Sequence, residues 1–241
     1  MTTQRSLQSV PLKIFAALAI CLALQLMFAN TQPKPQAQAH ALGTPPSTAL
    51  SKLISFGEPV ALAQLMTLYL QAFDNQPGIS IPFNNLDYPR VAMWLSRILE
   101  LDPHGQYPLM MASQLYSQVP DTAKQRYMLA FVYHAFFADP AHRWPWLAHA
   151  AIMAKHRLHD LPLALQYAQA IAKNAKGVDV PHWAVQMPIF ILEEMGEAES
   201  AKIMLGALLA NGTITDPHEI HFLLKRLETL KHGPKIEPPK L

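Results

Sequence analysis

Apolar residues recur at every third or fourth position from Thr48 onward, which is the spacing of one face of an α-helix. Prolines fall near the start of successive apolar stretches, where the first turn of a helix tolerates a missing N–H group. They are Pro59, Pro89, Pro108, Pro120, Pro145, Pro162, Pro181 and Pro217. The pattern predicts helices at about 47–56, 58–74, 87–101, 106–118, 120–138, 143–158, 160–175, 181–195, 197–211 and 216–231. Because most intervening turns are short, consecutive helices should be antiparallel neighbours.

Two stretches of the folded part and its end lack this helical period. Residues 75–86 (NQPGISIPFNNL) contain two prolines and predict a loop or a partly extended insertion. Residues 232–241 contain three prolines and predict a flexible tail. The whole chain has only nine glycines, which disfavours sheets built on many tight turns. The predicted fold class is therefore all-α.

The apolar run at residues 14–29 (IFAALAICLALQLMFA) is interrupted only by Gln25. It predicts a transmembrane segment that is either an uncleaved signal anchor or a cleaved signal peptide, since its length lies between the two. The A-x-A patterns at residues 37–41 lie too far downstream for a normal cleavage site, which favours the anchor. Residues 30–46 are rich in Pro, Gln and Ala and predict an extended linker.

Charge predicts the orientation of this segment. Arg5 and Lys13 precede the run without any acidic residue, and positive residues beside a first helix stay in the cytoplasm. We therefore expect a single-pass protein of a bacterial inner membrane, with residues 1–13 cytoplasmic and the domain at 47–231 periplasmic. The net charge is +2, and no basic run longer than Lys225-Arg226 exists, which argues against nucleic acid as a partner. The single cysteine, Cys21, is interpreted as a membrane-buried thiol.

Three strings in the folded part carry small or apolar residues at every third or fourth position. They are YPRVAMWLSRILELDP at 88–103, RYMLAFVYHAFFADP at 126–140 and LPLALQYAQAIAK at 161–173. The first two end in Asp-Pro, and these signals lie thirty-seven residues apart, at Asp102-Pro103 and Asp139-Pro140. A tetratricopeptide repeat has a period of about 34 residues. The chain resembles the tetratricopeptide repeat family over about residues 58–211.

Specific packing positions carry this resemblance. In a second helix they are Val91, Leu95 and Ile98, and in the following first helix they are Leu109, Ala112, Ser113 and Tyr116, with Asp121 at the turn. One repeat later the same register holds Trp146, His149, Ala150 and Met153. Residues 196–201 (GEAESA) match the turn and second-helix start, with Leu205 and Leu208 continuing the pattern.

The resemblance implies helix pairs stacked as a right-handed superhelix whose first helices line the concave face. The expected pairs are 58–74 with 87–101, 106–118 with 120–138, 143–158 with 160–175, and 181–195 with 197–211. The helices at 47–56 and 216–231 are expected to cap the two ends.

Catalytic and metal-binding patterns are weak in this sequence. His142, His149 and His156 recur every seven residues, about 10.5 Å apart along a helix, which is too far for two of them to share a zinc ion. The pairs His156/His159 and His218/His221 have workable spacing, but no third ligand is evident. The chain has no G-x-S-x-G elbow and no glycine-rich phosphate loop. We expect no catalytic, cofactor-binding or metal-ligating residues, and a protein that is not an enzyme.

A protein-binding face follows from the register of the resemblance. Tyr107, Trp144 and Trp183 occupy equivalent positions of three consecutive first helices. The next positions along the same face hold Met110, Leu147 and Gln186, and then Gln114 and Phe190. These eight residues are expected to contact a protein or peptide of the cell envelope, although packing between repeats is the alternative for the aromatic rings.

The predicted function is therefore that of a membrane-anchored periplasmic scaffold or assembly factor. The alternative is a helical domain that binds a small hydrophobic ligand such as a lipid or a cell-wall fragment. An enclosed apolar pocket favours the alternative, and an open amphipathic groove favours the scaffold.

Overall fold

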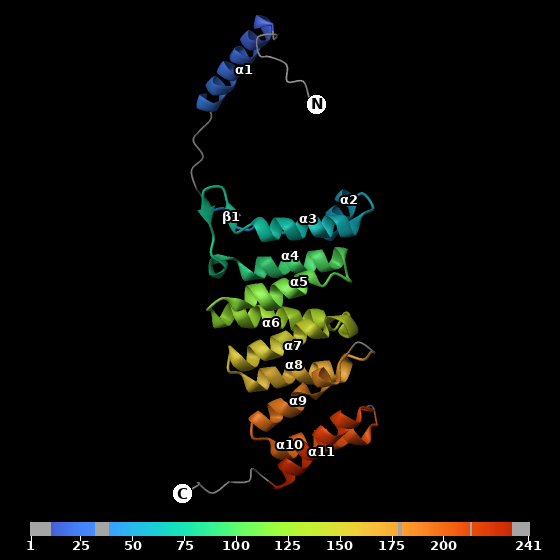
Figure 1. Cartoon of the computed structure of the whole chain (residues 1–241). Coiled ribbons are helices and arrows are strands. Elements are labelled where there is room, and N and C mark those ends of the chain that lie inside the picture. The colour runs from blue at the N-terminus through green and yellow to red at the C-terminus, as the bar shows by residue number, and fades with distance from the viewer. Residues whose placement is uncertain (1–10, 32–38, 178–179, 213, 233–241) are drawn as a thin grey trace, which may run out of the picture. The chain divides into compact units, whose positions relative to one another are not determined.

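The computed structural model describes residues 11–31, 39–177, 180–212 and 214–232 (Figure 1). Those residues contain eleven α-helices and one sheet of two short strands, so the all-α fold class is confirmed. The chain divides into a unit that contains its N-terminal part, Met1–Ala39, and a unit that contains the helical array, His40–Asn75 with Ser80–Leu241. Most of the predicted cytoplasmic segment, residues 1–10, and residues 233–241 of the predicted tail lie outside the described residues.

Helix α1 runs from Leu12 to Thr31 and is two residues longer at each end than the predicted segment. It has 20 residues and a mean hydropathy of 2.2, and is long and apolar enough to cross a membrane. At a rise of about 1.5 Å per residue, such a helix matches the thickness of a bilayer's hydrocarbon core. None of its residues is buried.

Nine of the ten helical segments predicted for the folded part are found as continuous α-helices, and the segment predicted at 106–118 is α-helical only in its first turn. The helices are α2 (Thr48–Ile54), α3 (Pro59–Ala72), α4 (Tyr88–Leu101), α5 (Tyr107–Met110), α6 (Thr122–Phe136), α7 (Pro140–His156), α8 (Leu161–Asn174), α9 (His182–Glu194), α10 (Ala198–Ala210) and α11 (Pro217–His232). The insertion between α3 and α4 holds the strands β1 (Asn75–Gln76) and β2 (Ile79–Ser80) and the short 3-10 turn Phe83–Asn85. It is thus partly extended, as predicted.

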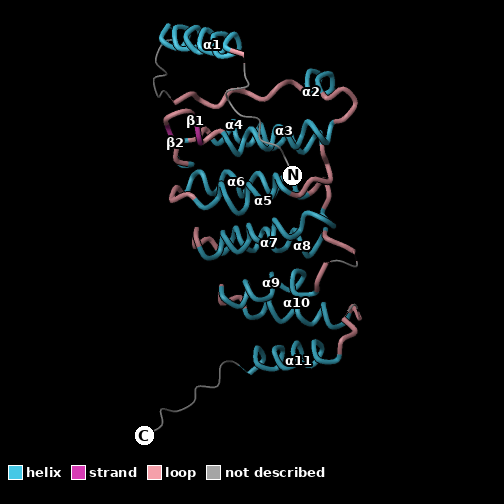
Figure 2. The backbone as a smooth tube through the Cα atoms, turned by 45° about the horizontal axis from the view of Figure 1, so that its top comes forward, coloured by secondary structure: helices cyan, strands magenta, loops and turns pink. Residues whose placement is uncertain are grey.

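Helices of the array contact their sequence neighbours (Figures 1 and 2). The partners of each expected pair contact each other. These contacts join α3 with α4, α7 with α8, and α9 with α10, and in the remaining pair the turns at 111–118 contact α6. Successive pairs are joined by contacts of α4 with α6, α6 with α7, and α8 with α9. One apolar core extends from Leu42 to Ile191, and a smaller cluster around Leu205 and Leu223 joins α9, α10 and α11.

Most of the packing positions read from the sequence are buried, whereas Trp146, His149 and Leu208 are half-buried. Val91, Leu95 and Ile98 of α4 have at most 2% of their surface exposed. Leu109, Ala112 and Tyr116 are equally enclosed, as are Ala201 and Leu205 near the other end of the array. Side chains start several helices by accepting a hydrogen bond from the third residue on, which satisfies a free N–H group of the first turn. Ser47, Asp87, Asp121 and Asp160 do so.

The start of α7 differs from the prediction. Asp139-Pro140 was interpreted as the end of a helix, yet Pro140 opens α7 after the short turn that follows α6. Pro145 consequently lies inside α7 and not in its first turn. The first turn of a helix tolerates either proline, so the sequence pattern alone does not separate the two starts.

The continuous helix expected at 106–118 is also wrong. After the single α-turn of α5, the backbone widens into a π-helical turn at Met111–Leu115 and then tightens into a 3-10 turn at Tyr116–Gln118. The buried Ser117 hydroxyl donates to the carbonyl of Ser113 at 2.5 Å, which competes with regular α-helical bonding. Val119 is extended, as a residue that precedes a proline prefers, and ends the segment.

The described parts of the linker predicted at 30–46 overlap with the neighbouring units, although residues 39–46 have no regular secondary structure. Its first residues continue α1 to Thr31, and residues from His40 onward belong to the helical array. Leu42, its one large apolar residue, is 2% exposed. Arg90 Nη1 donates to the carbonyl of Leu42 at 2.5 Å, and Trp94 Nε1 donates to the carbonyl of Gly43 at 2.9 Å. These two side chains of α4 fix the segment to the array.

Candidate functional site

Three aromatic side chains lie on consecutive first helices: Tyr107 at the start of α5, Trp144 on α7 and Trp183 on α9. We call them the aromatic row. Trp183 is 51% exposed and Tyr107 is 42% exposed, whereas Trp144 is partly buried. The rings of Trp144 and Trp183 meet edge to face with centroids 5.4 Å apart. The structure therefore brings two of the predicted residues into direct contact and leaves apolar surface of the row open to solvent.

Polar contacts connect the helices that carry this row. Gln71 of α3 donates its side-chain amide to the Tyr107 hydroxyl at 2.5 Å. Trp146 of α7 donates its indole N–H to the Gln106 side-chain oxygen at 2.7 Å. Because both bonds join neighbouring first helices, they hold the start of α5 between α3 and α7.

A buried arginine, Arg143, holds the loop that precedes Tyr107. Arg143 of α7 is 4% exposed, and its guanidinium donates to the carbonyl of Ala135 at 2.6 Å and to that of Pro103 at 2.7 Å. Burial lowers the pKa of this guanidinium, and the nearby carboxylate of Asp139 opposes that shift. Arg143 thereby ties the end of α6 and the loop before Tyr107 to the helix that carries Trp144.

Two shallow hollows border the aromatic row. One of about 420 Å³ lies beside Tyr107 and includes Gln64, Leu68 and Gln71 of α3. The other, of about 510 Å³, lies beside Trp144 and includes His104, Gln106 and His142. Each combines apolar carbon with amide or imidazole groups that can hydrogen-bond a peptide backbone.

Three of the eight predicted contact residues are unsuited to this role. Leu147 is fully buried in the core, with 0% exposed. Gln186 is 5% exposed and donates to Glu219 of α11 at 2.5 Å, and the guanidinium of Arg226 lies 5.9 Å from the Phe190 ring. The register implied a continuous face, but α11 packs against this part of α9. Met110 is partly buried, and Gln114 is exposed, as expected of a surface contact.

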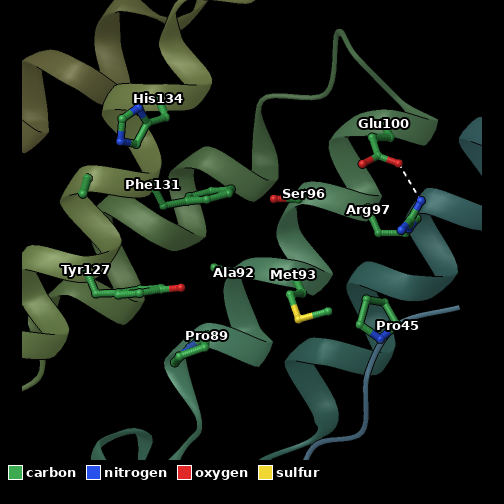
Figure 3. Close-up of a pocket in the computed structure, with 11 residues that line it drawn as sticks. Pro45, Pro89, Ala92, Met93, Ser96, Arg97, Glu100, Tyr127, Phe131 and His134 are labelled. Atoms are coloured by element: carbon green, nitrogen blue, oxygen red, sulfur yellow. Dashed lines mark hydrogen bonds and ion pairs between the residues drawn. The ribbon is translucent and has the colours of Figure 1, made fainter. Parts of the chain in front are cut away.

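A hollow that the sequence did not reveal lies between the second helices α4 and α6 (Figure 3). It measures about 550 Å³, and Tyr127 and Phe131 of α6 point across it toward Ala92 and Ser96 of α4. Met93 at its border is 48% exposed. Aromatic residues at helical spacing are typical of a core, so the sequence pattern does not separate a rim residue from a buried one.

The Arg97–Glu100 ion pair forms the polar end of this hollow (Figure 3). Arg97 Nη1 lies 2.6 Å from a carboxylate oxygen of Glu100. Thr48 of α2 also contacts this pair, which places the start of α2 against the end of α4. The hollow thus has an apolar floor and one charged edge.

The histidines of α7 lie in different surroundings. His142 is exposed, and its Nδ1 contacts Asp139 at 2.9 Å; this hydrogen bond lowers the pKa of Asp139. Burial lowers the pKa of His149, and a contact with the backbone of Ser113 opposes that shift. Within the described ranges, no three His, Cys, Asp or Glu side chains are grouped closely enough to hold a metal ion.

Comparisons of the chain with protein-family models, with curated proteins and with solved structures find no match.

Proposed function

We propose that this protein is a membrane-anchored helical-repeat scaffold that binds a protein or peptide partner through the aromatic row. The observation that carries this proposal is the exposure of Trp183 and Tyr107 beside the Trp144–Trp183 contact. Exposed aromatic rings held on a rigid scaffold supply large contact areas at little cost in side-chain entropy, and such rings dominate many interfaces. The neighbouring hollows offer space for the side chains of an extended or helical peptide.

The tetratricopeptide-like superhelix belongs to this proposal. Four contacting helix pairs and buried residues at the family's packing positions support it. The first helix of a pair would line the binding face, and the second helix would cover its back. The proposed binding residues are Tyr107, Trp144 and Trp183, with Met110 and Gln114 on the same segment as Tyr107.

The alternative, binding of a small hydrophobic ligand, has weaker support. A pocket for such a ligand usually encloses most of the ligand surface. The hollow between α4 and α6 has Met93 and Tyr127 at its border, and these side chains are 48% and 44% exposed. An open hollow of this kind suits a protein side chain better than a free lipid.

Site-specific photo-crosslinking in cells tests the binding role. A photoreactive phenylalanine at Tyr107 or Trp183 should give adducts of one defined mass, and Trp144→Ala should weaken them. Phe137 is the matched control, since it is an aromatic residue with 45% exposure that caps the C-terminal end of the second helix α6. Equal adducts at all three positions, or adducts at Phe137 alone, would contradict the proposal.

The proposed location is a bacterial inner membrane, with the helical array in the periplasm. It is supported by α1 and by the basic residues Arg5 and Lys13 that precede or begin it. A reporter that is active only in the periplasm, fused after Leu241, should be active, and the protein should stay in membranes after an alkaline wash. Activity of a cytoplasmic reporter would reverse the orientation, and release into the soluble fraction would show cleavage.

A further inference from the structure

Helix α3 is apolar on two opposite sides. Its sequence, PVALAQLMTLYLQA, contains no charged residue. Ala63, Met66 and Leu70 form its buried side in the array. Leu65 and Leu68 lie about half a turn away from that side and are 63% and 60% exposed. Ala61 and Ala72 extend this outer stripe and are also exposed. Gln64 is exposed among these residues, so the outer side of α3 is largely but not wholly apolar.

The corner between α2 and α3 exposes further apolar groups. Leu53 is 73% exposed, and Phe56 at the tip is 93% exposed. Phe56 has a φ of 49° and is followed by Gly57 with a φ of 87°. A bulky residue rarely adopts a positive φ, so the turn holds this ring away from the array at a cost in backbone energy. We call Leu53, Phe56 and Leu65 the N-terminal apolar face; Leu68 is left out because it also lines the hollow beside Tyr107.

The composition of α2 and α3 matches a lipid environment better than water. Lys52 and Glu58 are the only charged residues between Thr48 and Ala72. Together the two helices satisfy the length and hydropathy criteria for a membrane span, although they bend by 109° at their junction. A bend of this size prevents the two helices from forming one straight span, so in a bilayer the pair would lie along the surface and would not cross it.

The chain connection limits the distance between this face and the end of α1. Helix α1 ends at Thr31, and the helical array begins at His40. At no more than about 3.6 Å per residue, the intervening chain spans roughly 30 Å at most. If α1 crosses a bilayer, the connection is short enough for the first helices of the array to reach the surface of that bilayer.

We propose that the N-terminal apolar face rests in the interface of the bilayer that holds α1, with Phe56 inserted among the lipid chains. The proposal takes α1 as a membrane span and does not depend on the binding role of the aromatic row. Lipid would cover the outer stripe of α3, which the described part of the chain leaves open. The array would thus be attached to the membrane at two places, its tether and its first helices.

Spin-label accessibility in vesicles tests this attachment. The full-length protein is reconstituted in vesicles of phosphatidylethanolamine and phosphatidylglycerol, and the native Cys21 provides a reference label inside α1. In a Cys21→Ala background, single cysteines replace Phe56, Leu65 or, as a control, Ile203 of α10, which is 73% exposed. Labels at 56 and 65 should collide more with oxygen than with a water-soluble nickel chelate, as at Cys21, and the label at 203 should show the reverse.

A double substitution separates insertion from mere proximity. With Leu53→Glu and Phe56→Glu, the label at 65 should shift to the accessibility measured at 203, while the helical circular dichroism stays unchanged. Ile203→Glu is the matched control and should leave the label at 65 in lipid.

Three results would overturn the proposal. Water accessibility at 56 and 65 equal to that at 203 would show that the face is not in lipid. Exclusion of both reagents together with spin–spin broadening would show that a second copy covers it. Water accessibility at Cys21 would remove the membrane span on which the proposal rests.

Discussion

The two ends of the helical array are covered in different ways. At the C-terminal end, α11 buries Leu223 against α9 and α10 and exposes charged residues, among them Lys225, Arg226 and Glu228. At the N-terminal end, α3 buries Met66 against the array but exposes Leu65 and no charge. Stacked repeats normally need terminal helices with polar outer faces to remain soluble. The outer face of α11 is mixed, since it exposes Phe222 and Leu224 beside its charged residues, whereas the outer side of α3 has no charged residue at all.

Ion pairing reinforces this contrast. Arg226 of α11 contacts both carboxylate oxygens of Glu193 on α9, with Nε at 2.9 Å from the nearer one. The side-chain hydrogen bond with Glu193 raises the pKa of Arg226. Lys155 of α7 also contacts Glu194 on α9. Charged contacts thus hold the C-terminal helices together along their exposed edges, whereas the N-terminal helices present hydrocarbon.

The inner faces of the two ends should nevertheless be equally important for stability. Leu223→Ala and Met66→Ala should each lower the free energy of unfolding by about 2–5 kcal/mol, because both remove buried hydrocarbon and leave a cavity. Leu223 is 1% exposed and Met66 is 5% exposed. Urea unfolding of the detergent-solubilised protein, followed by circular dichroism, measures the effect. A near-zero loss for Met66→Ala alone would mean that the N-terminal end needs its cover in order to pack.

A substitution of the buried Arg143 in the middle of the array should lower the free energy of unfolding. Arg143→Met removes the donor that satisfies the carbonyls of Ala135 and Pro103. An unsatisfied buried group costs about 1–3 kcal/mol, so the free energy of unfolding should fall by at least that amount. Arg143→Lys keeps the charge and one donor and should cost less. Unfolding of the two ends at separate midpoints in Arg143→Met would show that this contact couples them.

Acid should lower the free energy of unfolding through His149, which lies on α7 in the middle of the array. Burial depresses the pKa of His149 in the fold, so the unfolded chain binds the proton more readily. Stability should therefore fall as the pH drops below about 6.5, the ordinary value for histidine. His149→Gln should flatten this dependence between about pH 8 and pH 5.

The pH window of the effect assigns it to His149. The depressed pKa of Asp139 acts in another window, because its stabilising contribution is lost only below its ordinary value of about 3.9. A flat pH profile of the unmodified protein above pH 5 would contradict the assignment.

The smallest effects on stability are expected on the exposed surfaces. In detergent, Leu65→Ser on α3 and Leu224→Ser on α11 should each change the free energy of unfolding by no more than about 0.5 kcal/mol. Both residues are more than half exposed, at 63% and 51%. In vesicles the two substitutions should differ in their effect on stability, since of these two residues only Leu65 belongs to the proposed lipid contact. Equal behaviour in detergent and in vesicles would remove this difference between the ends.

Trp183→Ala should also have little effect on stability, but it should weaken binding. Trp183 is 51% exposed, so its loss should leave the unfolding midpoint close to that of the unmodified protein while the crosslinked adduct at Tyr107 decreases. Trp144→Ala should lower both, because Trp144 is partly buried against the core. A large drop in the midpoint for Trp183→Ala would identify the ring as packing.

Most of the helix positions follow from local rules in the sequence. The 3.6-residue period and the prolines identify all ten helices of the array, and the apolar run identifies α1. Local rules fail where a distant residue decides the conformation. The carbonyls of Leu42 and Gly43 accept hydrogen bonds from Arg90 and Trp94, distant partners that no spacing rule identifies. The register identifies the three residues of the aromatic row. It cannot show that α11 contacts Gln186, which the same register assigns to the binding face.

The all-α class, the order of the helices and the apolar segment long enough to cross a membrane can all be predicted from the amino-acid pattern. These properties depend on periodicity, proline placement and composition, which are local and need no partner. Which apolar residues are covered depends on how the helices pack. Leu147 and Trp183 occupy similar positions in the sequence pattern, yet one is enclosed and the other is half exposed. Likewise, Met66 and Leu65 are adjacent in one uncharged helix. Because α4 packs against a single side of this helix, Met66 is buried and Leu65 is exposed.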